Sequence, residues 1–219
     1  MSDKCAPPSG VGGLITMKII CVGRNYGKHI EELQNERPSE PVIFMKPDSA
    51  VLLNQHPFVI PEFSNDIHHE IELIVRINKV GKHIDTKFAH KYYDEISVGI
   101  DFTARDLQNE LKAKGLPWEK AKSFDGSAVI GQFLQKKQFN SLENITFELT
   151  NNNKTVQKSN ASYMLWKIDE LISYISQYFT LKIGDIIFTG TPEGVAAVNS
   201  DDVLEGFLEG NKLFSIKIK

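Results

Sequence analysis

Two acidic side chains, Glu70 and Glu72, stand in the segment HHEIELIV at 68–75. If this segment is a strand, Ile71 and Leu73 point to one face and the two glutamates point to the other. Their Cα atoms would lie ~6.6 Å apart, close enough for both carboxylates to reach one cation. A site made only of oxygen ligands suits Mg²⁺, Mn²⁺ or Ca²⁺ better than zinc. From these residues alone, the alternative is a half-buried strand whose polar face is solvated.

A third acid, Asp101, follows the apolar segment 96–100 and precedes a helix predicted to begin at Thr103. A side chain at a strand end is fixed yet open to a ligand, although most aspartates before a helix simply cap it. In that helix Arg105 and Gln108 are three residues apart and share a face. Their guanidinium and amide groups could hold a carboxylate and a carbonyl of a substrate, or they could form plain helix surface.

Other polar residues give weaker signals. His29 and Glu32, three residues apart after the first strand, could form a pair in which the carboxylate orients the imidazole as a general base. The segment 184–194 leads a buried strand into a Gly/Pro turn that could present backbone N–H groups and the Thr191 hydroxyl to an anion. Lys122 is a single lysine in a polar segment. A solvated surface role is the alternative for all of these.

Short β-rich segments must position these side chains. β-Branched and aromatic residues bounded by Gly, Pro or Asn predict strands at 18–23, 42–46, 70–77, 96–100, 145–150, 185–189 and 213–218. Helices are predicted at 26–33, 103–115 and 168–178, the last with an apolar face formed by Leu171, Ile172, Ile175 and Phe179. Because the strands do not alternate regularly with helices, a mixed, mostly β fold is expected rather than a doubly wound sheet.

The chain of 219 residues is long enough for one domain with a substantial core. We expect a single domain at 17–219, preceded by a Gly-, Pro- and Ser-rich segment at 1–16 that is a disordered leader or tag. Cys5 and Cys21 are too few for a disulfide framework, which favours the reducing cytoplasm, with Cys21 as a buried apolar residue. A net charge of −3 without basic clusters argues against nucleic-acid binding, and no apolar segment approaches the length of a membrane span.

Taken together, these segments resemble the fumarylacetoacetate hydrolase family, in particular its short branch of acylpyruvases and oxaloacetate decarboxylases. A lone pair of glutamates is a weak signal, but several motifs in the family's order are a specific one. The matching stretches are VGRNY at 22–26, His29 with Glu32, KP at 46–47, HHEIEL at 68–73, GIDFTARDLQ at 99–108, GLPWEKAKSFDG at 115–126 and GDIIFTGTPEGV at 184–195.

The resemblance implies a role for each candidate residue and a fold. The fold would be a β-sandwich or roll with a few short helices, assembled as a homodimer. An Mg²⁺ or Mn²⁺ ion would be held by three acids, with a lysine beside the substrate oxygens and a catalytic dyad on a segment that closes over the substrate. The implied metal ligands are Glu70, Glu72 and Asp101; the catalytic residues are Lys122, His29 and Glu32; the substrate-binding residues are Arg24, Arg105, Gln108 and Thr191.

The expected substrate is a small 2-oxo acid, which can chelate a cation through its carboxylate and 2-oxo oxygens. The cation and Lys122 would then stabilise enolate charge. We expect hydrolysis of a C–C bond in an acylpyruvate-type 2,4-dioxo acid, because His29 with Glu32 could activate water, and oxaloacetate decarboxylation as a further activity. We expect the loops 54–65 and 151–164 to form the pocket for the variable part of the substrate.

Two other functions stay open from the sequence. The first is a 2-hydroxyhepta-2,4-diene-1,7-dioate isomerase or an oxaloacetate tautomerase-like enzyme, which would use the same electron sink without hydrolysis. The second is a non-catalytic domain that binds a metal or ligand. The dyad argues against the second, since a binding domain has no use for a general base.

Overall fold

A seven-stranded mixed sheet forms the centre of the protein. The structure, a computed structural model, describes residues 18–33, 36–53 and 56–219, so the leader predicted at 1–16 lies outside it. The strands of this sheet are β1 (Ile19–Gly23), β2 (Val42–Lys46), β4 (Ile71–Ile77), β5 (Tyr93–Asp101), β7 (Ala128–Ile130), β8 (Leu134–Gln135) and β11 (Ile186–Phe188). Their order is β2-β1-β11-β4-β5-β7, with β8 also paired to β5.

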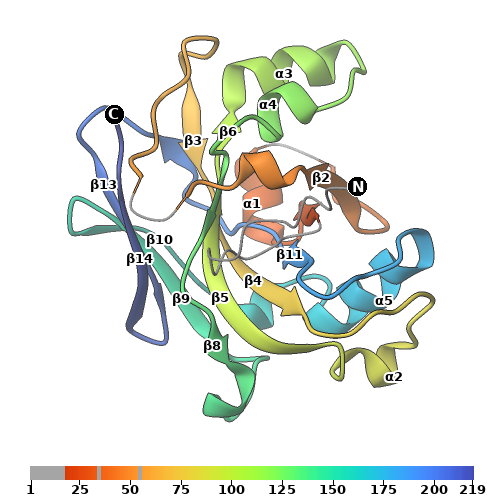
Figure 1. The fold of residues 1–219 in the computed structure, drawn as a ribbon. Helices are drawn as coiled ribbons and strands as arrows, with labels where there is room; N and C mark the ends of the chain where they lie inside the picture. The colour runs from red at the N-terminus through yellow and green to blue at the C-terminus, as the bar shows by residue number, and fades with distance from the viewer. Residues whose placement is uncertain (1–17, 34–35, 54–55) are drawn as a thin grey trace, which may run out of the picture.

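The central strands are apolar on both faces, as expected for a sheet that is covered on both sides. The side chains of the IICV segment of β1 and the IIF segment of β11 are almost completely buried, and these two strands run parallel. The other neighbours in the sheet are antiparallel. The long strands β4 and β5 curl across the molecule (Figure 1).

A second, antiparallel sheet lies on one side of the central sheet (Figure 1). Its order is β10-β9-β13-β14, made of β9 (Thr146–Asn151), β10 (Lys154–Asn160), β13 (Val203–Leu208) and β14 (Asn211–Lys217). Apolar side chains from both sheets form one core, among them Leu73, Val98, Phe147, Leu149 and Leu204. The predicted mixed, mostly β fold is therefore confirmed.

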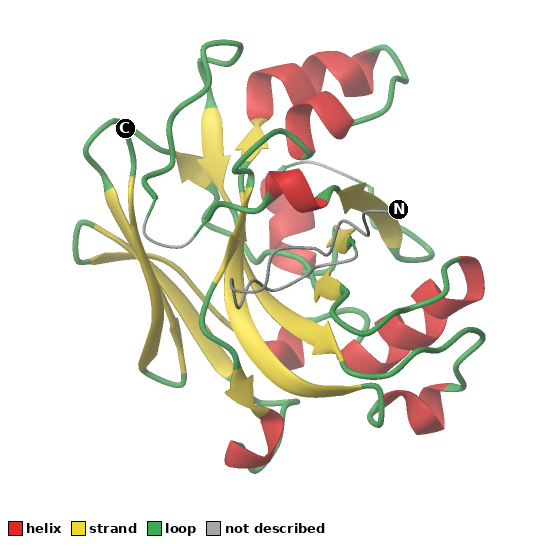
Figure 2. Ribbon diagram, viewed as in Figure 1, coloured by secondary structure: helices red, strands yellow, loops and turns green. Residues whose placement is uncertain are grey.

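A small third sheet and short helices complete the described fold. The third sheet has the order β12-β3-β6, from β3 (Ile67–His69), β6 (Thr103–Ala104) and β12 (Ala196–Ala197). The helices lie mainly on the side of the central sheet away from the second sheet (Figure 2). They are α1 (Gly27–Glu32), α2 (Thr86–Ala89), α3 (Arg105–Ala113), α4 (Glu119–Lys122) and α5 (Ile168–Tyr178).

The three predicted helices are α1, α3 and α5, and α5 has the predicted bounds. Its predicted apolar face is confirmed, with Leu171, Ile172 and Ile175 fully buried. Helix α3 begins two residues later than predicted, because Thr103 and Ala104 pair with β3 instead. Cys21 is buried and free, as predicted.

One predicted loop is wrong. The segment 151–164 contains strand β10, which pairs along its length with β9. Its buried positions are the polar residues Gln157 and Ser159, so the strand lacks the apolar alternation by which a half-buried strand is normally found. In the other predicted loop, residues 54 and 55 lie outside the described residues.

Among the described residues, no helix is both long enough and apolar enough to cross a lipid bilayer.

Candidate active site and metal centre

The HHEIELIV segment crosses from one sheet to another at Glu70. Residues before it belong to β3 in the small sheet, and residues after it belong to β4 in the central sheet. The predicted alternation holds: Ile71 and Leu73 are in the core, and Glu70 and Glu72 point to the other face. Both glutamates are buried all the same, at 4% and 2% exposure. This excludes the alternative of a solvated polar face.

Asp101 joins the two glutamates through the register of the antiparallel strands β4 and β5. Glu72 pairs with Gly99, and the Asp101 N–H donates to the Glu70 carbonyl at 2.9 Å, so Glu70 and Asp101 face one another. A side chain at position 99 would collide with the Phe188 ring and the Val129 carbonyl. One carboxylate oxygen from each of the three acids lies within 4.8 Å of the others.

Three cations surround these acids. The Lys122 ammonium, at the end of α4, donates to Glu70 Oε2 at 2.7 Å and Asp101 Oδ2 at 2.7 Å. Lys46, at the end of β2, places its Nζ 2.8 Å from Asp101 Oδ1. Arg105 Nη2 donates to Glu70 Oε1, and its Nη1 donates to Gln108 Oε1 at 2.7 Å.

The electrostatics of the three acids differ. Burial opposes ionisation of Glu70, but Lys122 and Arg105 outweigh it and hold the pKa of that carboxyl well below its usual range. Burial, followed by repulsion from Asp101 and Glu70, raises the pKa of Glu72 well above its usual range. Glu72 is thus the acid of the three whose negative charge the neighbouring side chains offset least. A divalent cation held by the oxygens of Glu70, Glu72 and Asp101 would offset it, so the donor set fits the predicted Mg²⁺ or Mn²⁺.

The predicted pair of His29 and Glu32 lies on α1. His29 Nδ1 is 3.3 Å from Glu32 Oε2, and the Gly194 N–H donates to Glu32 Oε1 at 3.1 Å. Burial lowers the pKa of His29 below 6.5 despite the nearby Glu70 and Glu32 carboxylates. The imidazole is thus neutral at pH 7, and with Nδ1 beside Glu32 its Nε2 is left to exchange a proton.

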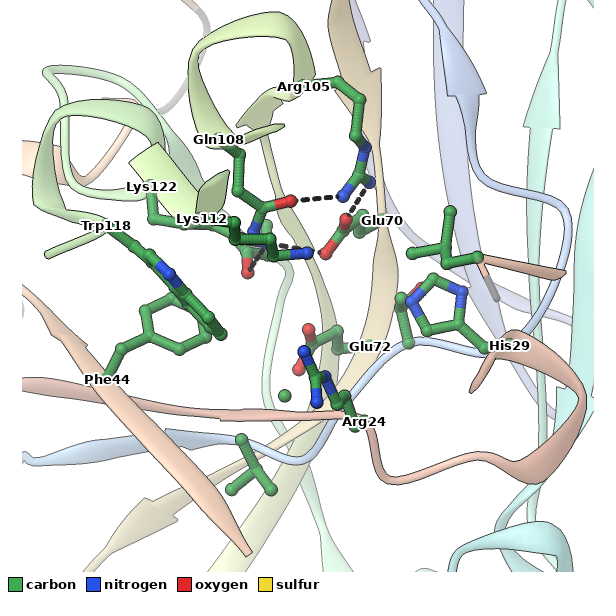
Figure 3. A pocket seen from close by; sticks show the side chains of 15 residues that line it. Arg24, His29, Phe44, Glu70, Glu72, Arg105, Gln108, Lys112, Trp118 and Lys122 are labelled. Atoms are coloured by element: carbon green, nitrogen blue, oxygen red, sulfur yellow. Dashed lines mark hydrogen bonds and ion pairs between the residues drawn. The ribbon is translucent and has the colours of Figure 1, made fainter. Parts of the chain in front are cut away.

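Nine of the ten predicted site residues line one pocket (Figure 3). Glu32, the tenth, does not line the pocket but contacts the imidazole of His29. The nine are Arg24, His29, Glu70, Glu72, Asp101, Arg105, Gln108, Lys122 and Thr191. Neither of the two loops expected to contact the variable part of the substrate contributes a described residue to the lining of this pocket, and that expectation stays a prediction.

Six residues that line the pocket were not predicted as site residues, and three of them, Phe44, Lys112 and Trp118, have large side chains with a polar or aromatic group. A signal existed for Lys112, which continues the face of Arg105 and Gln108 by one helical turn. No periodic pattern marks the two aromatic residues, because they come from a strand and from the residue before α4.

Comparison with known proteins places these residues in context. The model of the fumarylacetoacetate (FAA) hydrolase C-terminal family matches residues 18–214. The chain belongs to the fumarylacetoacetate hydrolase family. The predicted resemblance is therefore confirmed, and the mostly β architecture with a curled sheet and short helices is that of the family.

The names of similar proteins in the family give three activities: oxaloacetate tautomerase, oxaloacetate decarboxylase and fumarylpyruvate hydrolase. An oxaloacetate tautomerase of Escherichia coli is 39% identical over 197 residues, which cover 90% of each chain. A mitochondrial oxaloacetate decarboxylase of Dictyostelium discoideum is 42% identical over 194 residues, 88% of this chain and 89% of that one. The crystal structure of fumarylpyruvate hydrolase from Pseudomonas aeruginosa in complex with Mn²⁺ and pyruvate has a TM-score of 0.87 and 34% identity, covering 93% of this chain and 89% of that one.

Proposed function

We propose that this fumarylacetoacetate hydrolase family enzyme interconverts the enol and keto forms of oxaloacetate, or of a closely related 2-oxo dicarboxylate. The observation that carries the proposal is the balance of charge in the pocket. Lys46, Lys122 and Arg105 contact Glu70 and Asp101, and two further cations, Arg24 and Lys112, line the same pocket. With a divalent cation bound, the positive charge of the pocket would exceed that of its three acids by more than one unit, which favours a dianion such as oxaloacetate over a monoanion. The names of two relatives support the same substrate.

The residues of the chain suit enol chemistry. A bound divalent cation supplies a Lewis acid that stabilises enolate charge on the substrate oxygens. Lys122 adds a buried ammonium beside Glu70 and Asp101, and the low dielectric of a buried position strengthens its interaction with enolate charge. Arg105 and Gln108, linked by a hydrogen bond, orient the substrate carboxylate. His29 is the neutral base that removes or returns the proton at the carbon next to the 2-oxo group.

Acylpyruvate hydrolysis is the second candidate, and the contact of His29 with Glu32 favours it. In this reaction His29 takes a proton from water, the hydroxide attacks the distal carbonyl, and the C–C bond breaks to release pyruvate enolate and a carboxylic acid. Decarboxylation of oxaloacetate would use the same electron sink. A dienoate isomerase is a further use of the pocket, whereas a non-catalytic domain would not need a buried histidine oriented by a carboxylate.

The test is a substrate comparison with metal control. Enol-to-keto conversion of oxaloacetate, and pyruvate release from oxaloacetate and from acetylpyruvate, are measured with Mg²⁺ or Mn²⁺, then with EDTA, then with metal restored. We expect tautomerisation to be fastest, lost on chelation and regained with metal. Faster hydrolysis of acetylpyruvate would favour the second candidate, and no turnover of either substrate by the metal-loaded protein would contradict both.

The homodimer and the cytoplasmic location stay predictions. Sedimentation equilibrium of the full chain measures the first. Fractionation of the source cells measures the second, and the name of the Dictyostelium relative makes mitochondria the compartment to compare.

A further inference from the structure

Lys112 differs from the three cations that are paired with the acids of the metal centre. It lies on α3, seven residues after Arg105 and four after Gln108, so the three side chains share one face of the helix. All three line the pocket, and Figure 3 shows the Lys112 side chain extending into it. Lys46, Lys122 and Arg105 are each paired with a carboxylate, but across residues 18–33, 36–53 and 56–219 the Lys112 ammonium has no hydrogen bond or ion pair.

An aromatic side chain holds this ammonium in place. Lys112 Nζ lies 5.4 Å from the centroid of the Trp118 ring, a cation–π distance. The Trp118 ring in turn lies 6.1 Å from the Phe44 ring across the same pocket. The aromatic face fixes the position of the charge without neutralising it, so the ammonium stays available to an anion.

The surroundings of Lys112 favour an anion beside it. Burial, followed by repulsion from Arg105, Arg24 and Lys122, lowers the pKa of Lys112 to about 8. The Lys112 ammonium lines the pocket beside the Trp118 ring, whereas Lys46, Lys122 and Arg105 are already paired with the acids of the metal centre. Arg24 also lines the pocket without an ion pair among the described residues, but it follows β1 and does not share the α3 face of Arg105 and Gln108. A single carboxylate on the substrate would satisfy Arg105 and the metal centre and leave Lys112 without a partner.

We propose that Lys112, seated on Trp118, binds the second carboxylate of a dicarboxylate substrate and thereby selects dicarboxylates over 2-oxo acids with one carboxylate. The inference rests on the proposed function, which requires a dicarboxylate, and adds the residue that recognises it. Lys112 acts on substrate choice and not on the reacting carbon, so its loss changes KM far more than kcat.

Lys112→Gln tests the subsite, with Lys114→Gln as its matched control. Lys114 lies just beyond the same helix, is exposed, and pairs with Glu110 away from the pocket. In Lys112→Gln we expect the KM for oxaloacetate to rise by about tenfold or more, the size expected for a lost charged partner. The inhibition constant of pyruvate should stay within about twofold. Pyruvate has one carboxylate, which under this proposal does not contact Lys112, so the substitution removes none of its hydrogen bonds. Lys112→Arg recovers most of the affinity because it keeps the charge.

Equal weakening of oxaloacetate and pyruvate in Lys112→Gln would overturn the proposal, and so would no change in either. Binding is also followed by the thermal shift that each ligand causes in the Mn²⁺-loaded protein, which needs no turnover. Wild-type protein that is stabilised by oxaloacetate but does not convert it would contradict the proposed function. The comparison of Lys112→Gln with Lys114→Gln in the same thermal assay would then still decide for or against the subsite.

Discussion

The two sides of the pocket are built differently. The carboxylate side, which we define as Glu70, Glu72, Asp101, Lys46 and Lys122, is at most 4% exposed, and Figure 3 shows its glutamates projecting from the sheet. Each of its charged groups has a partner within 3 Å. Its geometry is set by the pairing of β4 with β5, in which every backbone group is fixed by its neighbour.

A second group of residues, which we call the helix side, consists of His29 and Glu32 on α1, Lys112 on α3, and Arg24 in the segment between β1 and α1. Its contacts are longer or missing: His29 and Glu32 are 3.3 Å apart, the Glu32 side chain is 35% exposed, and Lys112 has no charged partner in the part of the chain that the structure describes. Helix α1 has six residues and no side-chain cap at its N-terminus, so little besides tertiary contact holds it. The difference indicates that the sheet fixes the reaction centre and that the helices adjust base and substrate.

Glu72→Gln should cause the largest loss, because it removes a charged ligand from the carboxylate side. The amide oxygen can still accept the Gly190 N–H, which donates to Glu72 at 2.6 Å, so the fold is retained. We expect no measurable turnover, and Mn²⁺ binding weakened by more than the roughly 10–100-fold typical of an outer-shell partner. Mn²⁺ titration followed by electron paramagnetic resonance measures the binding. Glu110→Gln, on the exposed face of α3, is the control, and unchanged binding and activity in Glu72→Gln would remove the metal assignment.

Lys122→Met should also cause a large loss, and it should act mainly on kcat. Loss of a charge that stabilises enolate oxygens typically costs about 10²–10³-fold in kcat, with a smaller change in KM. The same change leaves Glu70 and Asp101 without their shared donor, so the melting temperature of the metal-free protein should fall. Lys120→Met, exposed on the same helix, is the control. Added Mn²⁺ should restore much of the melting temperature but not kcat; recovery of both would mean that Lys122 serves structure alone.

The sequence predicts the carboxylate side better than the helix side, for a physical reason. Alternation in a strand predicts that Glu70 and Glu72 share one face, which is a property of the backbone and needs no knowledge of the pairing partner. Asp101 joins them only through the pairing of β4 with β5, and its role as a metal ligand was predicted from the resemblance to the family. The position of Lys46 beside Asp101 depends instead on the pairing of β1 with β2, which no local pattern encodes.

The helix side and the second sheet depend on contacts between distant segments. Lys112 and Trp118 meet only when α3 and α4 fold against each other, and spacing in the chain does not show that their side chains touch. Strand β10 escapes prediction because its inward positions are polar: Gln157 is 2% exposed and is buried through hydrogen bonds instead of apolar packing. Residues that serve the site thus break the apolar pattern that prediction relies on.

His29→Gln should distinguish the two reactions that need a general base, tautomerisation and hydrolysis, from decarboxylation, which does not need one. We expect tautomerisation and acylpyruvate hydrolysis to fall by about 10²–10⁴-fold, the usual contribution of a general base. Oxaloacetate decarboxylation needs no proton removal at its start and should change little. Because burial lowers the pKa of His29, the imidazole is a free base at and above pH 6.5, so the wild-type rate should fall only as the pH drops below that value. An equal loss of all three reactions would contradict the separate role of the helix side.

The smallest effect is expected at Gln157, which connects the two sides. Its Oε1 lies 2.9 Å from His69 Nδ1 and accepts the Ile71 N–H at 3.0 Å, between the two glutamates. Its Nε2 donates to Thr191 Oγ1 at 3.0 Å. Thr191 lies in the turn that leads to Gly194, whose N–H donates to Glu32 Oε1. Gln157→Leu should lower the melting temperature and raise KM by about two- to tenfold, the range for one lost hydrogen bond.

A double-mutant cycle with Thr191→Val separates the two ends of this connection. If Gln157 acts only by holding Thr191, the rise in KM should be the same in Gln157→Leu, Thr191→Val and the double variant. If it also holds the carboxylate side through Ile71, Gln157→Leu should in addition lower kcat and weaken Mn²⁺ binding, which Thr191→Val should not do. Additive effects on KM would show that the two residues act independently, so Gln157 would not act by holding Thr191.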